Sequence, residues 1–135
     1  MHDSRDEGMR LYHVWFSTKG RKAALEGEVG EDVKRMLSGI AQRASIELLE
    51  IEVAVDHAHL LLALRTEQTL ASAMHQLKGA TSRLISLKYP EVKADMKAVA
   101  FWQKGYGWRE LDASQVPLVR DYIRTQQDRP LRHAH

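Results

Sequence analysis

Two histidines separated by one residue are the first side chains in this sequence that could do chemistry. His57 and His59 follow Asp56 and run directly into three leucines. On a β-strand, residues i and i+2 project from the same face, so both imidazoles can reach one ion. Neutral imidazole binds divalent metals, so this spacing favours a metal site. A second His-Ala-His, residues 133–135, stands in a polar tail. The alternative is therefore two half-exposed histidines with no ligand role.

A tyrosine and a glutamine one helical turn apart form a second group. Tyr122 and Gln126 are spaced i and i+4, which makes them neighbours on one helix face. A phenol can act as a nucleophile, and a carboxamide can supply a neutral oxygen ligand. Because a free phenol has a pKa of about 10, its ionisation at pH 7 costs roughly 4 kcal/mol, which a nearby cation must offset. The alternative is a packed tyrosine and a solvated glutamine.

Basic and aromatic side chains are interleaved in three other parts of the chain. Cations neutralise phosphates, and aromatic faces stack on unpaired bases at about 1–3 kcal/mol per base. The pattern indicates a nucleic-acid surface, although two of the three tryptophans could belong to the core and the lysines could serve solubility alone. The candidate DNA contacts are Lys19, Arg21, Lys78, Arg83, Trp102, Lys104, Tyr106 and Arg109.

Hydrophobic periodicity predicts the elements that must position these groups. Strands are expected at residues 11–18, 49–55, 57–64 and 101–111, and a loop at 19–28. Helices are expected at 28–44, from residue 70 until Pro90, and from an N-cap at Ser114 to about residue 127. This order predicts an α+β fold, the ferredoxin-like split βαβ (β-α-β-β-α-β) with an antiparallel sheet, plus a C-terminal helix carrying Tyr122. That helix or a partner chain would cover the open face of the sheet.

Length and composition set the remaining expectations. The 135 residues contain no cysteine, which excludes disulfides and thiolate chemistry, and the net charge of +2 is compatible with nucleic acid. One domain is expected at residues 10–128, between a flexible tail at 1–9 and a polar tail at 129–135. No apolar run approaches the ~20 residues that span a bilayer, and residues 1–9 hold no signal-peptide core. A cytoplasmic protein without membrane association is expected.

The chain as a whole resembles the single-tyrosine HUH transposases of the insertion-sequence 200/605 group, from about residue 11 to 128. Departures are Gly20, where members often have tyrosine, and the pair Gly107-Trp108. The likeness rests on the order and spacing of six segments: Tyr12-His13-Val14-Trp15, Lys19-Gly20-Arg21, Val55-Asp56-His57-Ala58-His59-Leu60-Leu61-Leu62, Leu77-Lys78-Gly79-Ala80, Phe101-Trp102-Gln103-Lys104-Gly105-Tyr106 and Tyr122-Ile123-Arg124-Thr125-Gln126-Gln127.

The resemblance implies a role for each matching residue. His57 and His59 match the metal ligands, Gln126 matches the third ligand, and Tyr122 matches the nucleophile that becomes 5′-phosphotyrosine. The implied function is a metal-dependent DNA strand transferase and endonuclease that uses Mg²⁺ or Mn²⁺. Its implied partners are single-stranded DNA with subterminal hairpins and a second copy of the chain. No nucleotide cofactor is expected, since no P-loop is present.

Three other functions are compatible with the same residues. A domesticated relative would process chromosomal hairpins, and a catalytically silent regulator would bind hairpin DNA without turnover. A small ferredoxin-like module would use the two histidines as a structural metal site. Formation of a covalent protein–DNA adduct distinguishes the enzyme from the regulator and from the small module.

Overall fold

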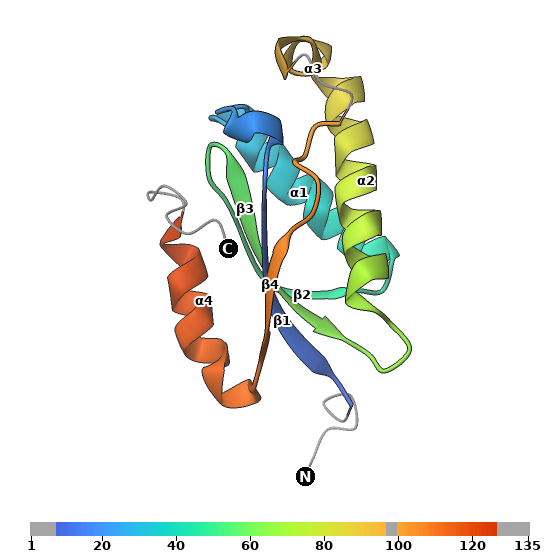
Figure 1. Ribbon diagram of the computed structural model, residues 1–135, viewed down its shortest axis with the longest axis vertical. Helices are drawn as coiled ribbons and strands as arrows, with labels where there is room; N and C mark the ends of the chain where they lie inside the picture. The colour runs from blue at the N-terminus through green and yellow to red at the C-terminus, as the bar shows by residue number, and fades with distance from the viewer. Residues whose placement is uncertain (1–7, 97–99, 127–135) are drawn as a thin grey trace.

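The computed structural model describes residues 8–96 and 100–126, which form one antiparallel sheet with helices on both faces (Figure 1). The sheet has four strands in the order β2-β3-β1-β4, and every neighbouring pair is antiparallel. The elements are β1 (Arg10–Ser17), η2 (Lys19–Arg21), α1 (Glu28–Arg43), β2 (Glu47–Val53), β3 (His57–Leu64), α2 (Leu70–Lys88), α3 (Pro90–Met96), β4 (Gly107–Leu111), η3 (Ala113–Gln115) and α4 (Val116–Arg124).

Helices α1 and α2 lie on one face of the sheet, and α4 lies on the other (Figure 1). The α1/α2 side holds the larger apolar cluster, in which Val14, Leu60 and Leu62 are fully buried. A smaller cluster joins Ile123 of α4 to Leu61 and Leu111 of the sheet. This arrangement confirms the predicted split βαβ fold with an additional C-terminal helix that covers the open face.

Strand β3 is central, and all eight of its residues are buried. Alternation along the strand sends Ala58, Leu60 and Leu62 toward α1 and α2, while His57, His59 and Leu61 face the α4 side. Each buried leucine on the first face contributes about 1.5–3 kcal/mol relative to an exposed position. The apolar face therefore fixes the register that aligns the histidines on the other face.

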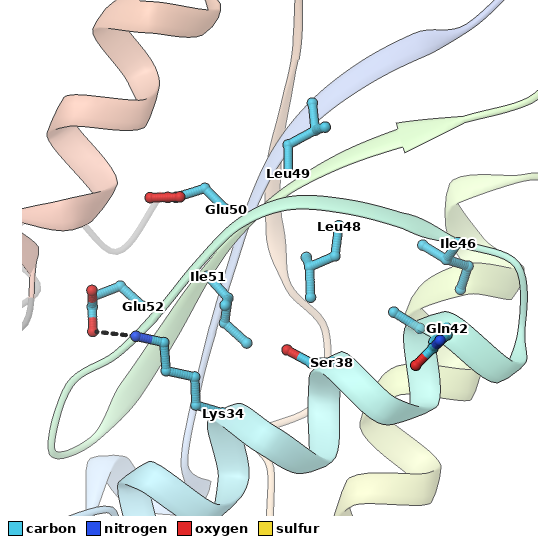
Figure 2. Close-up of a pocket in the computed structure, with 10 residues that line it drawn as sticks. Lys34, Ser38, Gln42, Ile46, Leu48, Leu49, Glu50, Ile51 and Glu52 are labelled. Carbon is cyan, nitrogen blue, oxygen red and sulfur yellow. Dashed lines mark ion pairs between the residues drawn. The ribbon is translucent and has the colours of Figure 1, made fainter. Parts of the chain in front are cut away.

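The alternation predicted for residues 49–55 is wrong in part, because β2 contains a bulge. The pairing with β3 shifts between Leu48 and Glu50. Figure 2 shows the result: Leu48 and Ile51 point toward α1, whereas Leu49 points away from it. A bulge adds one residue to one strand and reverses the faces beyond it. Val55 follows the strand and is 45% exposed.

The same close-up shows a groove of about 430 Å³ between α1 and β2, an edge strand of the sheet (Figure 2). Lys34 of α1 pairs with Glu52 of β2 at 3.6 Å, across this groove. Neither His57 nor His59 lines this groove, because both belong to β3, the strand that pairs with β2. The groove therefore lies apart from the predicted metal ligands.

The predicted strand at 101–111 is too long, since β4 begins only at Gly107. Before it, Trp102 makes one isolated bridge to Thr18, and Gly105 has a left-handed φ of 83° that interrupts an extended strand. Phe101 and Trp102 are buried against the main core. The aromatic content that predicted a strand here reflects a loop packed into the core.

The helix boundaries differ from the predicted ones at three places. Pro90 ends α2, as expected, but it also begins the short helix α3. Asp112, rather than Ser114, caps the last helical segment: its side chain and that of Gln115 each accept a hydrogen bond from the other's backbone N–H. The loop expected at 19–28 contains the short turn η2.

Two observations concern the rest of the chain. Among the described residues, no helix is both long and apolar enough to cross a membrane. The tails expected at 1–9 and 129–135 lie outside the described residues, apart from residues 8 and 9. The predicted domain at 10–128 covers all the elements given above.

Candidate active site

The two predicted metal ligands lie side by side on the α4 face of β3. His57 is fully buried and His59 is 2% exposed, and their ring centres are 5.1 Å apart. The alternation of the strand places both rings on one face, as the i and i+2 spacing predicts. The alternative of two half-exposed histidines is wrong, because α4 covers this side of the sheet.

Each of these histidines is hydrogen-bonded through its Nδ1 atom. His57 Nδ1 lies 2.7 Å from Oδ1 of Asp56, and His59 Nδ1 lies 2.9 Å from Nε2 of His13. The Nε2 atoms of His57 and His59 are buried and have no hydrogen-bond partner among residues 8–96 and 100–126. Buried polar atoms are normally satisfied, so two such nitrogens on neighbouring rings are suited to coordinate a ligand. Histidine ligands of metals show this same arrangement, with the second ring nitrogen held by a hydrogen bond.

Burial keeps two rings of this cluster neutral. It lowers the pKa of His59 to about 3, with His13 and His57 as further causes. It lowers the pKa of His13 to about 4, and the charge of Arg109 lowers it further. Both rings are therefore uncharged at pH 7. A neutral imidazole retains the lone pair that coordination to a metal requires.

Tyr122 of α4 extends over the histidine cluster of its own chain. The centre of its ring lies 5.8 Å from the ring centres of both His13 and His59, in edge-on contacts. The side chain is 45% exposed, so the phenol borders the histidines and also meets solvent. The tertiary structure thus brings the predicted nucleophile and the predicted metal ligands together within a single chain.

Gln126 lies just beyond the end of α4 and is 3% exposed. Its Nε2 donates to the backbone carbonyl of Tyr122 at 3.2 Å, which keeps the two residues one turn apart as predicted. Within the described part of the chain, no group of three His, Cys, Asp or Glu side chains could hold a metal ion. A three-ligand site here would therefore need a different side chain as its third ligand, such as this carboxamide.

Polar contacts to β2 fix helix α4 in place. Glu50 pairs with Arg124 at 2.7 Å and with Arg120 at 3.6 Å. Arg120 also donates to the carbonyl of Leu49 at 2.6 Å. On the same helix, Ile123 is fully buried in the smaller apolar cluster. Ion pairs and apolar packing together hold the segment that carries Tyr122.

The eight predicted DNA contacts lie in several places. Five of them line a groove of about 670 Å³ between α2 and the loop before β4: Lys19, Lys78, Trp102, Lys104 and Tyr106. Arg83 lines a different groove beside α1 and α2, and Arg21 lies 3.7 Å from Asp56. Arg109 is exposed on β4, where it pairs in register with His13.

Two residues of the 670 Å³ groove have structural partners. Trp102 is 4% exposed and donates its indole N–H to Thr81, so its ring belongs to the core and offers no stacking face here. Lys78 donates to the backbone carbonyls of Gln103 and Gly105, and burial lowers its pKa. Lys19 and Lys104 are exposed and remain the predicted phosphate contacts of this groove.

Analysis of the sequence missed the side chains that surround the histidine pair. His13 and Trp15 alternate on β1 toward the α4 side, and their rings are 4.9 Å apart. A Cβ atom at Gly107 would lie 2.1 Å from the Trp15 ring, so only glycine leaves room for the indole. The period of two in strand β1 was the signal that could have placed His13 and Trp15 on one face of that strand, whereas their contact with His59 depends on the register between β1 and β3.

Comparison with known proteins gives consistent matches. The family model "Transposase IS200 like" matches residues 9–126. The ISDra2 transposase TnpA of Deinococcus radiodurans is 30% identical over 118 residues, which cover 87% of this chain and 84% of that protein. The transposase for insertion sequence element IS200 of Salmonella typhimurium is 29% identical over 115 residues, 85% of this chain and 75% of the relative.

Solved structures agree with the sequence matches. The crystal structure of a transposase from Deinococcus radiodurans superimposes with a TM-score of 0.74 at 27% identity, covering 94% of this chain and 98% of the other. A REP-associated tyrosine transposase bound to a REP hairpin shares the fold, with a TM-score of 0.64 at 12% identity over 91% of this chain and 70% of the other. Because the family model covers 118 of the 135 residues, the chain belongs to the family of IS200-like transposases.

Proposed function

We propose that this transposase cleaves and rejoins single-stranded DNA at hairpin-bearing element ends through a covalent 5′-phosphotyrosine at Tyr122. One observation carries the proposal. The centre of the Tyr122 ring lies 5.8 Å from that of His59, and within the described part of the chain the buried Nε2 atoms of His59 and its neighbour His57 have no partner. A nucleophile close to a pair of nitrogen ligands has the parts that phosphoryl transfer requires, namely positioning and charge stabilisation.

The donor atoms of the two imidazoles and of Gln126 are of types that suit a divalent cation. His57 and His59 would hold it through Nε2, and Gln126 would add its amide oxygen as the third ligand. Imidazole and amide ligands add no negative charge when they coordinate, so the charge of the bound ion would stay available for the scissile phosphate. When bound, a divalent cation supplies the positive charge that polarises the phosphate and favours the phenolate. We propose Mg²⁺ or Mn²⁺, because open coordination positions and cellular availability matter more here than raw affinity.

In the proposed step, Tyr122 Oη attacks the scissile phosphorus. The Oη–P bond forms while the P–O3′ bond breaks. The phenol loses one proton, and the departing 3′ oxygen gains one. The downstream strand remains attached to the protein through its 5′ phosphate, and the upstream strand keeps a free 3′-OH. Attack by a 3′-OH on the phosphotyrosine reverses the step and joins strands without ATP.

Hairpin-bearing DNA is the partner that the proposal assigns. A protein of the same fold is bound to a REP hairpin, and the exposed Lys19 and Lys104 line a groove that could follow a phosphate backbone. We further propose that two copies of this chain act together as a homodimer, whose mass can be measured by light scattering.

A covalent-adduct assay tests the proposed function. Wild type and Tyr122→Phe are incubated with Mn²⁺ and a single-stranded hairpin oligonucleotide labelled at its 3′ or its 5′ end. Wild type should form a denaturation-resistant adduct that carries the 3′-end label only, because the nucleophile retains the downstream strand. Tyr122→Phe should form none, while the matched control Tyr89→Phe, at the C-cap of α2 and outside the proposed site, should still form it.

The other outcomes identify the alternatives. Hairpin binding without an adduct from wild type would favour a catalytically silent regulator. An adduct formed on chromosomal hairpins but not on the element's own ends would favour a domesticated processing enzyme. A chain that neither binds hairpins nor forms an adduct would favour a small metal-binding module.

A further inference from the structure

We propose that His13 is a positioning residue for His59: its Nε2 accepts the Nδ1–H of His59 and thereby leaves the His59 Nε2 lone pair free for the metal. This inference rests on the proposed metal site. Neither the family match nor the sequence pattern assigns His13 a role; the tertiary structure alone brings it to His59.

The contact between these rings is short and enclosed. His13 Nε2 and His59 Nδ1 are 2.9 Å apart, and the two side chains are 6% and 2% exposed. The planes of the two rings differ by 25° and their centres are 5.1 Å apart. Water therefore competes little for either nitrogen, and the hydrogen bond between the rings decides where the proton lies.

A hydrogen bond between two neutral imidazoles can have either polarity. If His59 donates from Nδ1, its Nε2 carries a lone pair and can bind a metal. If His13 donates from Nε2, the proton of His59 must lie on its Nε2, which cannot then coordinate. Only the first polarity lets His59 Nε2, which has no hydrogen-bond partner among the described residues, act as a metal ligand.

The neighbouring ligand shows why His13 matters more than an ordinary contact. His57 Nδ1 faces Asp56, and a carboxylate can only accept, so the tautomer of His57 is fixed by its partner's chemistry. His59 instead depends on a partner that could either donate or accept. The side chain at position 13 therefore sets the tautomer of His59, and with it the affinity of the pair for metal. Removal of a group that orients a histidine ligand typically costs about 10–100-fold in metal affinity.

Three substitutions of His13 separate hydrogen bonding from packing. His13→Gln places an amide oxygen near the position of Nε2, so it can still accept from His59. His13→Asn has the same amide but is one methylene shorter, and His13→Leu fills space without an acceptor. Mn²⁺ binding to the full-length, metal-free chain is measured by the EPR signal of free Mn²⁺, with the thermal midpoint and hairpin binding recorded beside it.

We expect His13→Gln to bind Mn²⁺ within about threefold of wild type, and we expect His13→Asn and His13→Leu to lose about 10–100-fold. Equal affinity for wild type, His13→Asn and His13→Leu would overturn the proposal. If wild type binds no Mn²⁺, or binds it no more tightly than His59→Ala does, the proposed metal site itself is wrong. That result differs from one in which only the role of His13 is wrong.

A measurement on the wild-type protein gives a test that does not depend on whether the variants fold. The ¹⁵N chemical shifts of the His59 ring in the metal-free wild type report which nitrogen carries the proton. A protonated Nδ1 supports the proposal. A proton on Nε2 overturns it, whatever the variants do.

Discussion

The two faces of the sheet differ in what their burial achieves. On the α1/α2 face, Leu60 and Leu62 of β3 are fully buried among apolar neighbours. On the α4 face, His57 and His59 of the same strand are equally buried, but two of their nitrogens have no partner among the described residues. One face stabilises the fold, and the other buries polar groups at some cost in stability, as the proposed metal site would require.

The α4 face is itself divided between these two purposes. Leu61, Leu111 and Ile123 form an apolar cluster, while the polar cluster around His59 lies further along the same strand and helix. The apolar cluster anchors α4, so the helix can carry Tyr122 to the histidines. Along β3, His59 lies two residues from Leu61 of this apolar cluster and one residue from Leu60 of the main core, and the separation of chemistry from stability can be tested at these positions.

The largest expected effect comes from His59→Ala. We expect cleavage of the hairpin oligonucleotide to fall by roughly 10³-fold or more, equivalent to about 4 kcal/mol, because a proposed metal ligand is lost. Hairpin binding should stay within a few-fold of wild type, since the metal serves chemistry more than docking. Gel-shift and adduct assays on the same samples measure both quantities. Parallel loss of binding and cleavage would contradict this separation.

Leu60→Ala is the matched change one residue further along, on the other face. It should lower the free energy of unfolding by about 2–5 kcal/mol, because it opens a cavity in the main core. Urea denaturation of the metal-free protein measures this loss, and His59→Ala should lose less than half as much. At temperatures where Leu60→Ala is folded, its Mn²⁺ affinity should match wild type. A greater loss of stability from His59→Ala would contradict the division between the faces.

Acidification should destabilise the histidine cluster selectively. Burial lowers the pKa of His13 to about 4 and of His59 to about 3, whereas both groups titrate near 6.5 in the unfolded chain. As pH falls from 6.5 toward 4, the unfolded state binds the extra protons, so stability is lost by up to about 1.4 kcal/mol per pH unit for each ring. Urea unfolding in the presence of a chelator at pH 7, 6 and 5 measures this slope.

The double variant with His13→Gln and His59→Gln should show a shallower slope over the same range. His75→Gln, which alters an exposed histidine of α2, is the control and should keep the wild-type slope. An unchanged slope in the double variant would show that other groups cause the acid sensitivity.

The smallest expected effect comes from Glu50→Gln, which removes the ion pairs that join β2 to Arg120 and Arg124 of α4. Such partly exposed pairs contribute about 0.2–1 kcal/mol, so global stability should change little. Amide hydrogen exchange in α4 should nevertheless become faster, while exchange in β3 stays the same. Glu47→Gln, at an exposed position of the same strand, should change neither. Unchanged exchange in α4 would show that apolar packing alone holds the helix.

Much of the fold followed from local pattern. The aromatic first strand, the leucine run after His59 and the two amphipathic helices predicted the element order correctly, because periodicity reports which faces are buried. The errors fell where packing overrides periodicity: the bulge at Leu48–Glu50 reversed one face of β2, and the aromatic loop before β4 was mistaken for a strand. Trp102 was assigned to a DNA surface for the same reason, since composition alone does not distinguish a stacking ring from a core ring.

The sequence by itself determined that His57 and His59 share a face and that Tyr122 and Gln126 stand one turn apart, because both relations follow from the fixed periods of a strand and a helix. Only the tertiary structure decided that Tyr122 lies against His59 and that His13, 46 residues away along the chain, contacts His59. The physical reason is that strand register and the packing of α4 depend on apolar contacts between residues far apart in the sequence, and these contacts cannot be predicted from the spacing of neighbouring residues.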